Sequence, residues 1–383
     1  MNSMHPVVVL GSYRWDEELL PVDEFGERLK RLRSLMRERG WQGVVAHGDA
    51  PDSAFVTWLT HFFPRMRWAL ALVGLQGEPE LLFAAPARDV PAARVLTWCS
   101  SLQAFASAKE LLPQWLQRQV GDSSATRPRI AVYGMQRMRA AVRRRLEESL
   151  GGQAELIDAQ AELDALMLRK RPRERRALLQ ARDILQASVQ ALRAAWAAGL
   201  PNAQAALDAE RAARLACAQD IRILFSEDGG RTLRPYERRS TVRSAPLVAY
   251  IAVRYLGYWV DAFVSCGTPA DGPYRAASAA LAAMIATAGP GVSGTRLLAA
   301  AAPAMTGFDW HPMLEGRVAS SVGLALDEPL RFDATSGDAM HDGGVYCLRA
   351  GACDDSGGAI VSALVAIVEG RPQLIFSALD GSP

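Results

Sequence analysis

Lysine is nearly absent from this chain of 383 residues. Only Lys30, Lys109 and Lys170 occur among its 43 basic residues, and the rest are arginine. A Schiff-base enzyme needs a buried, deprotonated amine, and Lys170 lies in the arginine-rich run 169–176, which predicts the solvated start of a helix. Pyridoxal phosphate chemistry is therefore not expected.

Cysteine is scarce as well, and its five copies are odd in number and follow no metal-ligand spacing. This usage predicts reduced thiols in a cytoplasm rather than a disulfide framework or a zinc site. Cys266 and Cys347 are candidates to line a cleft, but no histidine is paired with either in the sequence. The five cysteines are Cys99, Cys217, Cys266, Cys347 and Cys353.

Long hydrophobic runs and a strong charge of either sign are also lacking. The longest weakly polar run, 276–289, is too short and too rich in alanine to span a bilayer, and no signal pattern opens the chain. The net charge is +2, so no nucleic-acid partner is expected. Half of the residues are apolar, which with this length predicts two folded domains. We expect a cytoplasmic protein with no membrane partner.

Helical and strand patterns alternate along the first part of the chain. Apolar residues at helical spacing over 25–40 precede a buried strand at 43–46, which predicts an α/β domain ending near residue 160. A long helix is expected over 171–199, with Pro172 in its first turn, where the missing N–H has no partner to lose. Short β-like runs separated by glycines follow it.

One stretch has the frame of a metal-peptidase hairpin, which is an acid, ten residues and a second acid, but Tyr250 stands in place of the first acid. Gly257-Tyr258 precedes the second acid, Asp261. Together with motifs that follow in order, it resembles the creatinase and Xaa-Pro aminopeptidase superfamily over nearly the whole chain. The further motifs are the helix end at 289–291, the turn at 323–329 and the strand at 343–346.

This resemblance implies an α/β (α+β) protein of two domains. Residues 1–160 would form a creatinase-type accessory domain. Residues 161–383 would form a pita-bread, peptidase-like domain, with a curved, mostly antiparallel sheet flanked by helices. The resemblance also implies a homodimer in which the accessory domain of one subunit caps the cleft of the other.

The resemblance implies that active members of the superfamily are dinuclear metal enzymes, which hold two ions on Asp, Asp, His, Glu and Glu. Ligands that bridge the two ions leave room for an attacking hydroxide. Four of the five positions have lost their ligand here, and a shift of one residue at the first gives Ile251, which is no ligand either. Arginine at the fourth position would cost several kcal/mol beside a divalent cation. No metal and no cofactor are therefore expected. The five positions hold Tyr250, Asp261, Ser320, Arg349 and Ser362.

The resemblance also implies that metal is not essential for catalysis in every member, because creatinase itself looks like a metal-free member that uses a histidine and a glutamate. This chain lacks that histidine as well. His311 lies nine positions before Ser320 and not on a family position, so a loop histidine with satisfied hydrogen bonds is the simpler interpretation. The candidate catalytic residues are Asp261, Tyr250, His311 and Glu328, and the candidate substrate-binding residues are Arg349, Ser320, Ser362, Tyr258 and Asp327.

Two interpretations of this cleft remain open. Asp261 and Arg349 would form a buried salt bridge, with the other polar residues satisfying one another. Alternatively, or in addition, Arg349 would hold a substrate carboxylate while Asp261 or Tyr250 moves a proton.

The corresponding functions differ in class. We rank first a metal-independent, hydrolase-like or lyase-like enzyme acting on a small amino-acid-like or peptide-like substrate that carries a carboxylate, in specialised metabolism. The alternative is an inactive pseudopeptidase that binds a peptide or protein partner. An enzyme should keep an open pocket, whereas bulky residues would fill the pocket of a scaffold. A working metallo-aminopeptidase is not expected, because its ligands are absent.

Overall fold

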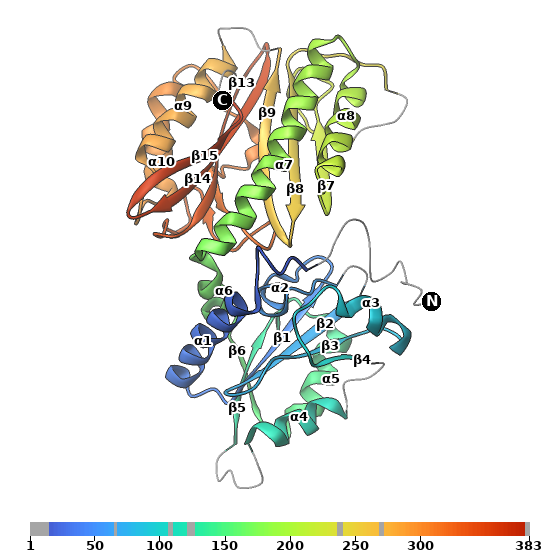
Figure 1. Cartoon of the computed structure of the whole chain (residues 1–383). Helices are drawn as coiled ribbons and strands as arrows, with labels where there is room; N and C mark the ends of the chain where they lie inside the picture. The colour runs from blue at the N-terminus through green and yellow to red at the C-terminus, as the bar shows by residue number, and fades with distance from the viewer. Residues whose placement is uncertain are drawn as a thin grey trace. The chain divides into compact units, whose positions relative to one another are not determined.

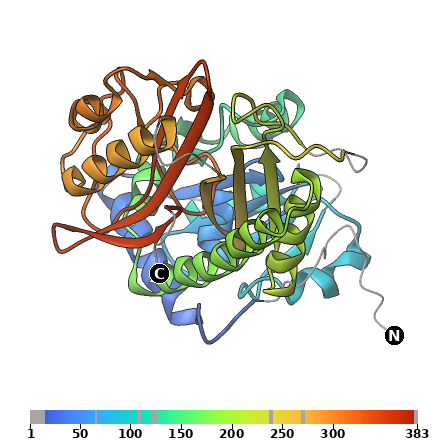
Figure 2. The same cartoon turned by 90° about the horizontal axis from the view of Figure 1, so that it is seen from above.

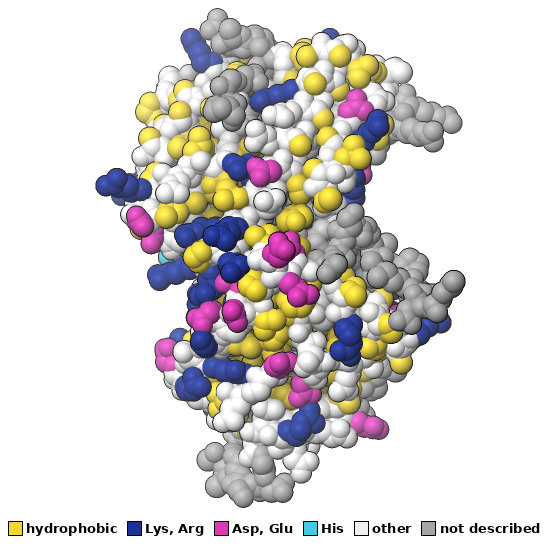
Figure 3. Space-filling model, viewed as in Figure 1, with side chains coloured by type: hydrophobic (Ala, Val, Ile, Leu, Met, Phe, Trp, Pro, Cys, Tyr) yellow, Lys and Arg dark blue, Asp and Glu magenta, His cyan; other side chains and the backbone are white. Residues whose placement is uncertain are grey.

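The computed structural model describes residues 15–64, 67–105, 110–120, 127–235, 240–267 and 272–379. The chain divides into two compact units, Met1–Met167 and Leu168–Pro383, called here the N-terminal and C-terminal units (Figure 1). In Figure 3 each unit carries both basic and acidic side chains on its visible surface, in keeping with the net charge of +2. No helix among the described residues is long and apolar enough to cross a bilayer.

The N-terminal unit is built on a six-stranded sheet of order β4-β3-β2-β1-β5-β6, in which β1, β5 and β6 run parallel and β2 pairs antiparallel with β1. Its strands are β1 (Gly43–Asp49), β2 (Trp68–Gly74), β3 (Glu80–Phe83), β4 (Leu102–Ala104), β5 (Arg129–Tyr133) and β6 (Glu155–Asp158). Its helices are α1 (Val22–Arg39), α2 (Ala54–Thr60), η1 (Ala87–Asp89), α3 (Val90–Arg94), α4 (Leu111–Val120), α5 (Ala140–Leu150) and α6 (Gln160–Leu168).

Apolar faces dictated by the sequence pattern build the core of this unit. Trp115 of α4 and Leu146 of α5 pack in one buried cluster with Val45 of β1. Helix α1 has the predicted helical spacing and ends at Gly40, whose φ of 68° is a left-handed conformation that glycine adopts without strain.

The C-terminal unit contains two antiparallel sheets, each covered by its own helices (Figures 1 and 2). The first is β7-β8-β9, against which α7 packs, and the second is β12-β11-β13-β14-β15, against which α9 packs, with β10 pairing to β13. The helices are α7 (Pro172–Ala197), α8 (Asn202–Leu215), α9 (Pro273–Thr287), α10 (Gly294–Ala301), η2 (Ala302–Met305) and η3 (Pro312–Leu314). The strands are β7 (Asp220–Phe225), β8 (Leu247–Tyr255), β9 (Tyr258–Cys266), β10 (Asp309–Trp310), β11 (Ala319–Ser321), β12 (Arg331–Phe332), β13 (Val345–Asp354), β14 (Gly357–Val368) and β15 (Arg371–Ser377).

Serine hydroxyls join the two sheets along the line where β9 meets β14, called here the seam. The Phe263 backbone N–H donates to Ser362 Oγ at 2.8 Å, and Ser265 Oγ donates to the Ile360 carbonyl at 2.9 Å. The Ile360 N–H in turn donates to Ser265 Oγ at 3.1 Å. Side chains thus replace part of a backbone ladder at the seam. The predicted fold class, mixed α/β with a mostly antiparallel C-terminal sheet flanked by helices, is confirmed.

Candidate functional site

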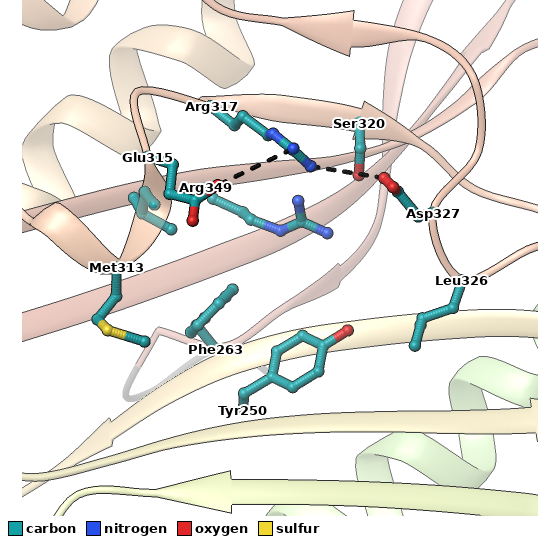
Figure 4. A pocket seen from close by; sticks show the side chains of 10 residues that line it. Tyr250, Phe263, Met313, Glu315, Arg317, Ser320, Leu326, Asp327 and Arg349 are labelled. Atoms are coloured by element: carbon teal, nitrogen blue, oxygen red, sulfur yellow. Dashed lines mark hydrogen bonds and ion pairs between the residues drawn. The ribbon is translucent and has the colours of Figure 1, made fainter. Parts of the chain in front are cut away.

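A cavity of about 260 Å³ opens in the C-terminal unit where the two sheets meet; we call it the central cavity (Figure 4). Residues of β8, β9, β11 and β13 form its floor, and the segment around η3 and the loop before β12 form its rim. Four predicted site residues are among those that line it, namely Tyr250, Ser320, Asp327 and Arg349.

Arg349 of β13 forms an ion pair with Asp261 of β9 across the seam. Its Nη2 lies 2.6 Å from the Asp261 carboxylate, and the two side chains are 13% and 4% exposed. Burial works against the charge on the guanidinium, but the Asp261 carboxylate raises the pKa of Arg349 above its ordinary value, so the arginine stays charged. The predicted buried salt bridge is confirmed.

The ion pair leaves part of the Arg349 guanidinium unused. Its Nε is buried and has no hydrogen-bond partner among the described residues, and its Cζ lies 5.9 Å from the ring centre of Phe263. A buried N–H donor without a partner costs on the order of 1–3 kcal/mol. Arg349 therefore presents both charge and an unused donor beside the cavity.

Tyr250 lies in the cavity wall on β8, with its ring 4.9 Å from that of Phe263 (Figure 4). Burial first, and then the nearby Asp261 carboxylate, raise the pKa of its phenol well above the ordinary value of 10.0. The hydroxyl therefore stays protonated and acts as a hydrogen-bond donor, with Asp261 as one partner.

Charged side chains line the rim. Arg317 is 3.5 Å from the Asp327 carboxylate and 4.0 Å from that of Glu315 (Figure 4). Arg331 also approaches Asp327, at 3.2 Å. Glu315 and Asp327 are 77% and 63% exposed, so these ion pairs are screened by water and contribute little to stability. A charged ligand can therefore replace one partner of these rim ion pairs at little energetic cost.

Ser362, predicted to bind substrate, lies at the seam instead of in the cavity wall. Its Oγ accepts the Phe263 N–H, and no part of it lines the central cavity. Cys347 is also buried at this place: its thiol lies 3.6 Å from the Asp261 carbonyl, and burial raises its pKa to about 12. A thiol in this state is a poor nucleophile.

The structure places His311, predicted as a catalytic candidate, outside the lining of the central cavity. Its Nε2 lies 2.6 Å from the Gly230 carbonyl, to which it donates, and its Nδ1 accepts the Met313 N–H at 3.3 Å. Burial lowers the pKa of the imidazole. Both ring nitrogens are thus occupied, as the simpler interpretation of the sequence expected.

Glu328 and Tyr258 also take structural partners away from the cavity. Lys170 Nζ lies 3.3 Å from both carboxylate oxygens of Glu328, and Glu328 accepts the Leu324 N–H at 3.0 Å. The Tyr258 hydroxyl donates to Glu174 at 3.0 Å, which anchors the first turn of α7 to β9. The prediction that Lys170 is solvated is wrong: its side chain is 2% exposed.

Several lining residues escaped the sequence reasoning, although a signal existed for some of them. Phe263 follows Asp261 by two positions in the same strand, so the two side chains share one face. Glu315 and Arg317 flank Gly316, four positions before Ser320, where the family resemblance implies an additional histidine. The others, Met313, Leu314 and Leu326, carry no such signal and are placed by the loops.

The residues at the five ligand positions do not fit a dinuclear metal centre. Asp261 is neutralised by Arg349, whose permanent cation would face the ions, and the Ser362 hydroxyl serves the backbone of β9. Within the part of the chain that the structure describes, no three His, Cys, Asp or Glu side chains are grouped so as to hold a metal ion.

Comparison with solved structures identifies related architectures. A prolidase from Thermococcus sibiricus matches with a TM-score of 0.73 at 14% identity, covering 93% of this chain and 98% of the other. An Xaa-Pro dipeptidase from Bacillus anthracis gives 0.71 at 16%, with 94% and 98% covered, and a dipeptidase PepE from Mycobacterium ulcerans gives 0.69 at 18%, with 94% and 96%. No protein-family model and no curated protein matches the sequence.

The likeness extends over nearly the whole of each chain, and the resemblance found in the sequence motifs points to the same proteins. The chain therefore has the pita-bread fold of the creatinase family, to which prolidases, Xaa-Pro dipeptidases and aminopeptidase P belong.

Proposed function

We propose that the central cavity binds a small amino-acid-like or peptide-like molecule through its carboxylate, and that the protein acts on it as a metal-independent, hydrolase-like or lyase-like enzyme. The observation that carries this proposal is the open cavity with a charged, incompletely bonded arginine in its wall. A cavity of about 260 Å³ stays open beside the five ligand positions, as expected of an enzyme rather than of a scaffold.

Each lining group has a part in this proposal. The Arg349 guanidinium is planar and offers parallel donors that match the two oxygens of a carboxylate. Phe263 and Tyr250 supply an apolar wall, and the Tyr250 phenol, held protonated, would donate a hydrogen bond to the ligand. Glu315 and Asp327 at the rim are placed to attract an ammonium group.

The pseudopeptidase alternative has one observation in its favour. Asp261, Arg349 and Ser362 all take part in bonds across the seam, so three of the five ligand positions already have a structural use. A protein whose cleft serves only its own fold could still bind a peptide or protein partner.

Calorimetry tests the carboxylate site on which the first function depends. We would titrate free dipeptides and N-acetyl amino acids, each beside its C-terminal amide, into the unaltered protein and into Arg349→Lys, which keeps the charge beside Asp261 but loses the fork of donors. For a used site, the carboxylate forms bind, the amides do not, and Arg349→Lys weakens binding by about 2 kcal/mol or more.

The matched control is Arg331→Lys, on the rim but outside the cavity wall, which should leave affinity unchanged. Carboxylates and amides binding equally well, or neither binding at all, would refute the carboxylate site and favour the pseudopeptidase. We further propose a cytoplasmic homodimer, on the basis of the cysteine usage and the family resemblance.

A further inference from the structure

A second cavity, of about 360 Å³, lies in the C-terminal unit beside the central cavity; we call it the side cavity. Leu298 of α10, Trp310 of β10 and Val318 form much of its wall, and Ala334 lies at its edge. Its volume falls within the range of about 300–1,000 Å³ that is usual for small-molecule pockets. None of the functions discussed above uses it.

The wall of the side cavity is mostly apolar. Leu298 and Trp310 pack against the main core of this unit but remain only partly buried, so part of each faces the hollow. Burying this apolar surface under an apolar ligand is favourable in free energy, because it removes the surface from water. A flat ring would find an aromatic partner in Trp310.

Few of the polar groups that line the side cavity have a hydrogen-bonding position that is not already used. Both nitrogens of His311 are engaged, and the Asp333 carboxylate accepts from Thr335 and Ser336. The indole N–H of Trp310 makes no hydrogen bond within the described ranges of the chain. The charged lining residues Glu315 and Arg317 pair with each other at 4.0 Å. The site thus offers a large apolar contact and few polar groups with hydrogen-bonding capacity left over, which suits a neutral ligand with a ring and at most one acceptor.

The two cavities share a wall, formed by Leu314, Glu315 and Arg317. The backbone of Glu315 is left-handed, with φ of 49°, although it is not glycine, and Gly316 follows with φ of 75°. Such a conformation is held in place by its surroundings and is frequent at functional segments. A ligand that packs against Leu314 from the side cavity would therefore act on the segment that carries the rim charges of the central cavity.

We infer that the side cavity is a second binding site, for a small, uncharged, ring-containing molecule that packs against Trp310. Indole is a suitable probe, because it is flat, neutral and small enough for the volume. Isothermal titration of indole into the full chain should give saturable binding with one site per chain and a Kd on the order of 1 mM or tighter.

Two variants test the location. Ala334→Trp places a large side chain at the exposed edge of the side cavity, and Trp310→Ala removes the ring that the ligand contacts; each should weaken indole binding by about tenfold or more. The control Ala302→Trp adds the same bulk at an exposed position of η2 that lines neither cavity, and it should leave the affinity within about twofold.

Arg349→Lys alters only the central cavity, so it should also leave the indole affinity within about twofold, whatever it does to carboxylate binding. No saturable binding up to the solubility of indole would overturn the inference. Binding that Trp310→Ala and Ala334→Trp both leave unchanged would overturn it as well, because the indole would then lie elsewhere.

Discussion

Removing the cation of the Asp261–Arg349 pair should destabilise the C-terminal unit far more than removing the pair as a whole. At 2.6 Å and an effective dielectric of 20, the attraction between the two charges is about 6 kcal/mol. Taking both groups out of water cancels most of this gain, so the net contribution of the intact pair is small. The large effect comes from leaving one charge alone.

Arg349→Met keeps the bulk of the side chain and leaves the Asp261 carboxylate, 4% exposed, without its cation. We expect this variant to lose about 3–5 kcal/mol of unfolding free energy. The double variant Asp261→Leu with Arg349→Met replaces the pair by apolar side chains and should lie within about 1 kcal/mol of the unaltered protein, or above it. The single and double variants are therefore expected to be strongly non-additive.

Urea denaturation, followed through the transition of the C-terminal unit, measures these differences. The control Arg331→Met breaks an ion pair whose partners are 48% and 63% exposed, and it should cost less than about 1 kcal/mol. A loss below about 1 kcal/mol for Arg349→Met, or a double variant less stable than the single one, would refute the reasoning, since Asp261 would then not depend on its partner.

Two further predictions concern buried ionisable groups and one concerns assembly. The pKa of His311 is lowered from 6.5 in the folded protein, so the unfolded chain binds this proton at a higher pH than the folded chain does, and stability should fall as the pH drops below about 6.5. His311→Gln should reduce this fall in melting temperatures measured over a pH series. An unchanged slope of stability against pH would contradict the prediction. Lys170→Met should cost about 3 kcal/mol or more in denaturation by leaving Glu328 buried and unpaired, and a change below about 1 kcal/mol would argue against this. Light scattering should give the mass of a dimer, and a monomeric mass of 41.5 kDa at micromolar concentration would contradict the homodimer.

The spacing of the motif around Gly257 and Asp261 made the central hairpin predictable from sequence. Leu256 and Gly257 both have positive φ, 46° and 86°, and Tyr255 pairs with Tyr258 across them, so a two-residue turn sets the register of β8 and β9. With the register fixed, the faces of Tyr250 and Asp261 follow from strand alternation. The ordered motifs of the family extended this to the rest of the sheet.

Partners distant in sequence were not predictable in the same way. Lys170 lies among arginines that favour a solvated helix start, and its partner Glu328 is 158 positions away. No sequence pattern around either residue indicates that the two form an ion pair. The role of Ser362 likewise depends on how β14 meets β9, and neither strand shows this in its own sequence. Long-range pairing therefore decided which polar residues face the cavity and which serve the fold.

Metal content tests the central claim most directly, because Arg349 and Asp261 neutralise each other at two of the five positions where the resemblance implies metal ligands. Protein purified without chelator, and then dialysed against manganese, cobalt, zinc or iron, would be examined by elemental analysis. The account predicts far less than one equivalent of any of these metals per chain, and unchanged stability after chelator treatment. Two equivalents per chain, removable by chelator with loss of stability or ligand binding, would contradict it.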